Sequence, residues 1–165
     1  MLKRLALACL ITCTALAAAP ARAANDVPFK GTWSGLTLSA DESGFPVVEI
    51  VAGGEGELTR LGHFTMISPH TSNVITGETI GDQIFTAANG DALTAFCAGG
   101  ATFIPGQAVH GLLDCSITSG TGRFANITGN YEFSFIATPR TDGGPGFATV
   151  AEISGSMSSI GSSQR

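Results

Sequence analysis

The sequence is a chain of 165 residues in which Asp and Glu outnumber Lys and Arg by 13 to eight. Three of the basic residues, Lys3, Arg4 and Arg22, lie at the extreme N-terminus. If that segment is removed, eight minus three leaves five basic residues against 13 acidic ones, a net charge of about −8. Such a balance is unfavourable for binding phosphate backbones, so we expect neither nucleic acid nor an anionic membrane surface as a partner.

The N-terminal segment has the pattern of a secretory signal peptide. Two basic residues precede an uncharged apolar stretch over 5–19, and small residues at Ala21 and Ala23 suit a signal peptidase. The stretch is shorter than the roughly 20 residues that a membrane-spanning helix needs. A lipoprotein signal is disfavoured because Cys9 lies too early in the apolar region. We expect residues 1–23 to be a signal peptide and 24–165 to be one secreted or periplasmic domain without membrane insertion.

Two cysteines, Cys97 and Cys115, remain after the signal segment. In an oxidising compartment a disulfide between them is the default expectation. Half of a metal site is the alternative, but neither a CxxC nor an HxxxH spacing lies nearby. We expect no metal and no cofactor.

The rest of the chain reads as short strands separated by tight turns. All 22 glycines lie there, and Val, Ile, Thr and Phe fill the stretches between them. No window repeats apolar residues at the helical spacing for three turns, so no long helix is expected. The predicted strands are 31–39, 45–52, 56–67, 74–86, 92–103, 108–118, 129–138 and 146–157.

Two of these predicted strands alternate clearly between apolar and polar residues, which indicates one face on a core and one in water. Their apolar rows are Tyr131, Phe133 and Phe135 in one strand, and Val109, Leu113, Cys115 and Ile117 in the other. Both rows should face the interior. The pattern in 56–67 is mixed, because each face of that predicted strand carries both apolar residues and a polar one. Arg60 lies on one face and His63 on the other.

A turn is predicted at Pro105-Gly106, a pair that suits positions i+1 and i+2 of a type II turn. Cys97 and Cys115 are equidistant from Gly106. A hairpin folded there would place the two cysteines opposite each other, at a separation that a disulfide can bridge. Eight antiparallel strands of this size must then either close into a barrel or stack as a sandwich.

Three segments together resemble a known family. They are GELTRLGHFT at 56–65, FTAANGD at 85–91 and GTGRFANITG at 120–129. Their order and spacing are similar to those of the barrel family of plant allene oxide cyclase, dirigent proteins and small secreted bacterial relatives. The resemblance covers roughly residues 54–157. The chain departs from the bacterial pattern in carrying Arg60 where His is usual and His63 where Arg is usual.

The resemblance implies an all-β fold, a closed antiparallel barrel of eight strands with an apolar interior, often assembled as a homotrimer. Members of the family guide reactive intermediates by shaping a pocket, without a cofactor. No catalytic residue can be matched to a position here. The expected function is binding of a small apolar or aromatic molecule, with guidance of a cyclisation or isomerisation as one use. The alternative is a non-catalytic ligand-binding or structural protein, and a hydrolase is a weaker third reading because no GxSxG, HExxH or P-loop motif occurs.

Candidate ligand-binding residues follow from the predicted interior rows. They are Arg60, Phe64, Tyr131, Phe133 and Phe135. An interior Arg60 would need a carboxylate partner, for which Glu49, Asp91 and Glu132 are candidates, whereas the alternative places Arg60 at a barrel mouth or on the surface.

Other polar and aromatic residues are expected to have structural roles or to face solvent. His70, after Pro69 in an expected loop, and His110 should be exposed. Arg123 should brace the glycine-rich turn by hydrogen bonds to carbonyls or an acid. Trp33 should lie in the core or at a barrel end.

Overall fold

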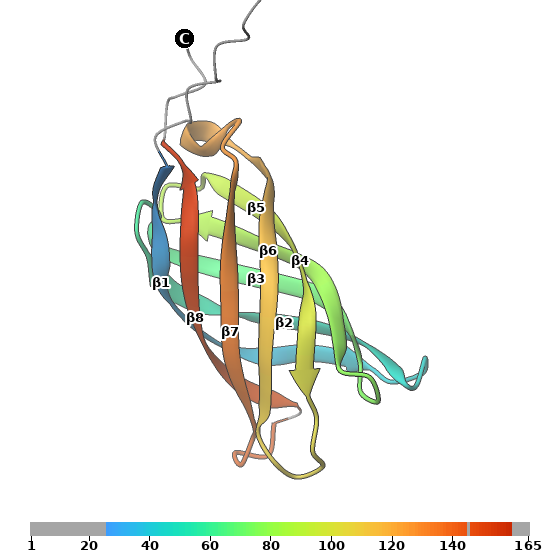
Figure 1. The fold of residues 1–165 in the computed structure, drawn as a ribbon. Helices are drawn as coiled ribbons and strands as arrows, with labels where there is room; N and C mark the ends of the chain where they lie inside the picture. Colours follow the sequence, from blue (N-terminus) through green and yellow to red (C-terminus); the bar gives the residue numbers. More distant parts are fainter. Residues whose placement is uncertain (1–25, 145, 160–165) are drawn as a thin grey trace, which may run out of the picture.

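Eight antiparallel strands close into a barrel in the computed structural model, which describes residues 26–144 and 146–159 (Figure 1). The strands are β1 (Asp26–Asp41), β2 (Val47–Leu58), β3 (Gly62–Asn73), β4 (Glu78–Ala87), β5 (Ala92–Thr102), β6 (Val109–Gly120), β7 (Gly129–Pro139) and β8 (Phe147–Ser158). Each strand pairs with the next in sequence, and β8 pairs with β1, so the sheet has no free edge. The predicted barrel is therefore confirmed, whereas the predicted signal peptide lies outside the described residues.

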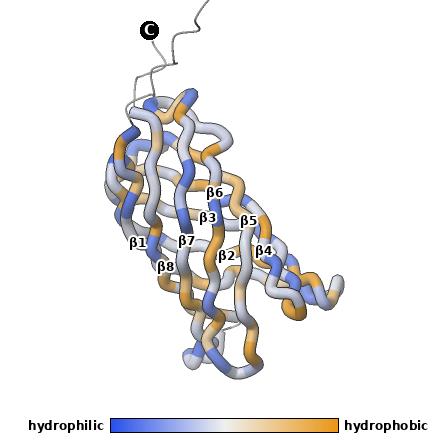
Figure 2. Tube along the Cα trace, viewed as in Figure 1, coloured by the Kyte–Doolittle hydropathy of each residue, from blue (hydrophilic) through white to orange (hydrophobic). Residues whose placement is uncertain are grey.

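Side chains alternate between the barrel interior and the solvent along the strands, most regularly in β1, β3, β4, β6 and β7. The predicted rows on β6 and β7 face inward: Leu113, Cys115, Tyr131 and Phe133 are buried, while Asp114 and Glu132 between them are exposed. Figure 2 shows the same change of hydropathy from residue to residue along these strands. Because of this period of two, every second side chain points into the barrel, and the apolar side chains among them form its core.

The β5–β6 hairpin forms as predicted. Gly106 has a φ of +76°, and the backbone N–H of Gln107 donates to the carbonyl of Ile104 at 3.0 Å, as a turn centred on Pro105-Gly106 requires. Cys97 therefore lies opposite Cys115, and their sulfurs form a disulfide. The disulfide is compatible with an extracellular or periplasmic location.

The predicted strand 56–67 is wrong, because the chain reverses direction within it. β2 ends at Leu58, residues 59–61 form a turn, and β3 begins at Gly62. Leu58 pairs with Gly62, so the hairpin is centred on residue 60 and positions of the same parity face the same side of both strands. Alternation thus continues across the turn, and the pattern cannot distinguish one long strand from two. Two residues of this hairpin have a positive φ, Gly62 at +73° and Arg60 at +74°, and Arg60 is not one of the residue types, such as Gly and Asn, that usually adopt it.

One end of the barrel, which we call the packed end, is filled by aromatic side chains. Phe29, Phe64, Phe85 and Tyr131 are buried with neighbouring ring centroids 5.1 to 6.2 Å apart. These separations and tilted rings are typical of favourable aromatic contacts. The 3-10 helix η1 (Gly122–Phe124) lies over this end and contributes the buried Phe124 (Figure 1).

Arg123 lies in the β6–β7 connection and forms hydrogen bonds with the β2–β3 and β4–β5 connections at the packed end. Its guanidinium Nη2 donates to the carbonyl of Leu61 at 3.1 Å, and its backbone N–H donates to Oδ2 of Asp91 at 3.2 Å. The guanidinium carbon also lies 4.7 Å from the centroid of the Phe124 ring. The predicted bracing role of Arg123 is confirmed.

The opposite end, which we call the open end, carries the β1–β2, β3–β4, β5–β6 and β7–β8 connections. In Figure 1 these connections extend downwards and to the lower right, away from η1. An extra residue in β1, Leu38, produces a bulge between Thr37 and Ser39 close to this end.

Candidate ligand-binding site

A cavity of about 90 Å³ lies inside the barrel towards the open end. It is several times larger than the roughly 10–15 Å³ that one water molecule requires, and smaller than the roughly 300–1,000 Å³ of a pocket for a drug-sized ligand. Residues from all eight strands or their adjoining connections line it: Trp33, Thr37, Ile50, Ala52, Met66, Ser68, His70, Ser72, Thr79, Gln83, Phe103, Val109, Leu113, Phe133, Phe135, Ala137, Phe147 and Thr149.

Aromatic side chains from β1, β7 and β8 form an apolar wall. Phe133 lies between Trp33 and Phe135, with ring centroids 6.1 and 5.9 Å away. Phe135 lies opposite Gly111 of β6, and its ring occupies the space that a β-carbon on Gly111 would need, 2.2 Å from two ring carbons. A glycine at position 111 is thus required for this ring to turn inward along the wall.

Polar side chains from β3 and β4 form the facing polar stripe, which consists of Ser68, His70, Ser72, Thr79 and Gln83. Ser72 and Thr79 share a hydrogen bond between hydroxyl oxygens 3.0 Å apart. All of these except His70 are buried, and hydroxyl and amide groups are costly to bury without partners. A mostly apolar cavity with a few convergent polar groups is the usual composition of a small-molecule site.

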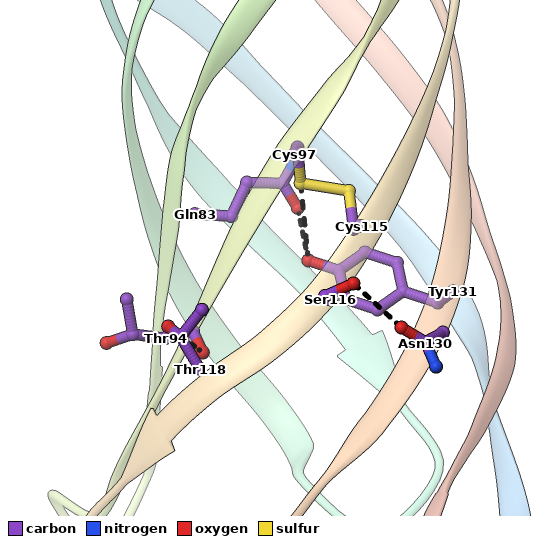
Figure 3. The surroundings of a disulfide bond; sticks show 8 residues. All are labelled: Gln83, Thr94, Cys97, Cys115, Ser116, Thr118, Asn130 and Tyr131. Carbon is purple, nitrogen blue, oxygen red and sulfur yellow. Dashed lines mark hydrogen bonds between the residues drawn. A yellow bond between two sulfur atoms is a disulfide. The ribbon is translucent and has the colours of Figure 1, made fainter.

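Gln83 is held by Tyr131 at the floor of the cavity. The phenolic O–H of Tyr131 donates to Oε1 of Gln83 at 2.8 Å, and the sulfur of Cys97 lies 3.8 Å from the same phenolic oxygen (Figure 3). Burial raises the pKa of Tyr131, so the phenol stays protonated and remains the donor. Gln83 itself lines the cavity, and because Tyr131 occupies Oε1, the amide N–H groups are what Gln83 can offer to a molecule there.

His70 lies in the polar stripe, which corrects the prediction of an exposed loop residue. β3 continues through Pro69 to Asn73, so His70 points inward in phase with the buried Phe64 and Met66 and is half-buried. Its Nδ1 lies 3.0 Å from the carbonyl oxygen of Ser68. Desolvation lowers the pKa of His70 despite that hydrogen bond, which favours the neutral imidazole. His110, by contrast, is exposed on β6 as predicted.

Trp33 lies between the packed end and the cavity. Its side chain is buried and lines the cavity, in line with the prediction of a core or barrel-end position. Among the described residues, its indole Nε1 is the buried side-chain nitrogen or oxygen without a hydrogen-bond partner. An unpaired buried donor beside a cavity points to an acceptor supplied by water or a ligand.

The five predicted ligand residues fall into three groups. Phe133 and Phe135 line the cavity. Phe64 and Tyr131 are buried in the packed end, where Tyr131 acts on the cavity only through Gln83. Arg60 is exposed in the β2–β3 turn, so its predicted interior position is wrong and its surface alternative is right. Because Arg60 lies in a turn, the alternation of the flanking strands does not determine where its side chain points.

Sequence reasoning missed most of the polar stripe. A signal was present, because the inward positions 64 and 66 continue at the same parity to Ser68, His70 and Ser72. Polar residues are not expected at interior positions of a strand, and a proline such as Pro69 usually indicates that a strand has ended. Pro69 is tolerated because β3 and β4 show no ladder pairing between the Ile67–Ile84 and His70–Gly81 pairs.

Within residues 26–144 and 146–159, no group of three His, Cys, Asp or Glu side chains is placed to hold a metal ion. The same residues contain no helix long and apolar enough to cross a membrane. Comparisons of the chain with protein-family models, with curated proteins and with solved structures found no match.

Proposed function

We propose that this protein is an exported barrel that binds a small apolar or aromatic molecule in the cavity at its open end. The observation that carries the proposal is the division of the cavity into an aromatic wall and a polar stripe, beside which the buried Nε1 of Trp33 has no partner among the described residues. The cavity volume fits a molecule of about one ring or a short chain, with any larger part extending through the open end.

The resemblance to allene oxide cyclase and dirigent proteins extends this proposal to guidance of a cyclisation or isomerisation. A rigid cavity with one apolar and one polar side can favour a single conformer of a bound intermediate, which accelerates a reaction by positioning alone. The alternative use of the same cavity is storage or transport of a ligand without chemistry. A time course of the free and protein-bound ligand, followed by chiral chromatography, separates the two uses, because only guidance yields an enantiomeric excess.

Binding is tested directly through Trp33, the single tryptophan of the chain. We expect toluene to change the intrinsic fluorescence of the purified protein in a saturable way, because Trp33 lines the cavity. Ala137→Phe should fill the cavity and abolish the change. Thr138→Phe, on the outward face of the same strand, is the matched control and should keep it. Equal responses from both variants, each with an unaltered far-UV circular dichroism spectrum, would contradict the proposal.

Native mass spectrometry of protein from its host would reveal a retained ligand and whether the protein is a trimer.

A further inference from the structure

His70 is the one ionisable residue among the described residues that line the cavity. The rest of the lining consists of apolar side chains, hydroxyl groups and the amide of Gln83. A cavity without a fixed charge is a poor site for an ionised ligand, because desolvation of that ligand would not be offset.

We propose that His70 is a specificity-determining residue of the cavity, whose Nε2 accepts a hydrogen bond from the ligand and selects uncharged molecules with a hydroxyl at one end. This inference rests on the proposed binding function and adds to it the chemical class of the ligand and the residue that selects it.

The hydrogen bond within β3 determines which nitrogen of His70 is available. A carbonyl oxygen can only accept, so the contact with Ser68 requires a proton on Nδ1. In the neutral imidazole, Nε2 then carries a lone pair and acts as an acceptor. Within the described residues no partner for Nε2 is found, so it is the nitrogen left for a ligand.

The strand beside His70 supplies a complementary donor. His70 pairs with Gly81 of β4, where a β-carbon would overlap the β-carbon of His70 and the carbonyl oxygen of Pro69, so glycine lets β3 and β4 pack closely at this pair. Gln83 lies two residues farther along the same inward face of β4. A ligand hydroxyl can therefore donate to Nε2 of His70 while its oxygen accepts from the amide of Gln83.

The charged groups around His70 belong to the outer surface. Asp41 of β1, Glu49 of β2 and Asp82 of β4 line an exterior groove to which His70 also contributes, and all three side chains are exposed. Because none of them lines the cavity, protonation of His70 would introduce an uncompensated positive charge there. Burial lowers the pKa of His70, so this happens only below the usual 6.5 of a histidine.

The test compares ligands that share one ring and differ in the end group. Toluene, benzyl alcohol and benzenesulfonate are titrated against the full chain, with Trp33 fluorescence as the readout. His70→Asn keeps an amide N–H near the position of Nδ1 and removes the atom at Nε2. We expect this variant to bind benzyl alcohol roughly fivefold more weakly, as the loss of one neutral hydrogen bond implies, and to bind toluene unchanged. His110→Asn, at the exposed β6 histidine, should leave both affinities unchanged.

Acidification gives a second readout. As the pH falls through the pKa of His70, benzyl alcohol should bind more weakly and benzenesulfonate more tightly in the wild type, and neither change should occur in His70→Asn. If toluene and benzyl alcohol both bind and respond equally to His70→Asn, the role of His70 is overturned while the proposed binding function stands. If toluene does not bind the wild type, the binding function fails and this inference fails with it.

Discussion

The two ends of the barrel are built from the same eight strands but have opposite interiors. At the packed end β3 and β4 contribute Phe64 and Phe85 to the interior, and the space is filled. Towards the open end the same two strands contribute Ser72 and Thr79, which leave a cavity against the aromatic wall. The closed sheet therefore determines where side chains point. The size and polarity of the inward side chains on β3 and β4 determine whether the interior is a packed core or a cavity.

The largest expected effect comes from removing an aromatic ring from the packed end. Phe85→Ala should lower the free energy of unfolding by about 3 to 5 kcal/mol, because the fully buried ring leaves a void among other rings. Phe135→Ala should cost only about 1 to 2 kcal/mol, because the half-buried ring lies beside existing space. Urea unfolding of both variants measures the contrast. Equal costs would show that the open end is packed as tightly as the packed end.

The disulfide lies between the two ends and should stabilise the barrel as a whole. Its cysteines are 18 residues apart, and closing a loop of that size contributes about 3 kcal/mol in the chain-entropy model. The double variant Cys97→Ala, Cys115→Ala should lose that amount in urea unfolding, and reduction of the wild type should have a similar effect. Rapid alkylation of both thiols in the folded, unreduced protein would contradict the assigned pairing.

A smaller effect is expected where the packed end meets the cavity. Tyr131→Phe removes the donor to Gln83 and should cost about 1 kcal/mol, the lower end of the range for an unsatisfied buried acceptor, because the cavity admits water. Adding Gln83→Leu to this variant should recover stability, since the acceptor is then gone as well. Calorimetric melting of the single and double variants checks the expectation, and a double variant less stable than either single one would oppose it.

The smallest effect concerns the pH dependence of stability. The pKa of His70 in the folded protein is lowered below its usual value of 6.5, so its contribution to stability is complete above that pH. As the pH falls below 6.5, the unfolded chain binds the proton first, and stability decreases until the pH passes the folded-state pKa. Between pH 8 and pH 5, the melting temperature of the wild type should therefore fall relative to that of His70→Asn. Parallel curves would place His70 in water.

Much of the fold could be predicted from the sequence, and the candidate site much less. The β5–β6 hairpin was predictable because Pro105-Gly106 restricts the backbone locally and the two cysteines confirm its register. The β2–β3 turn was not, because Arg60 adopts a positive φ without a local signal and the alternation continues through it. His70 and Gln83 were missed because a polar residue at an interior position has the pattern of a surface residue until the strands around it are placed.

The central claim is that the open end contains a ligand cavity and the packed end does not. Backbone amide chemical shifts of the isotope-labelled protein, recorded during a titration with benzyl alcohol, test it most directly. We predict saturable shifts at the cavity-lining Ser72, Thr79, Ala137 and Thr149, with little change at Phe29 and Leu93 of the packed end. Shifts spread over the exposed apolar residues of the outer surface, or no saturable shift at all, would contradict the claim.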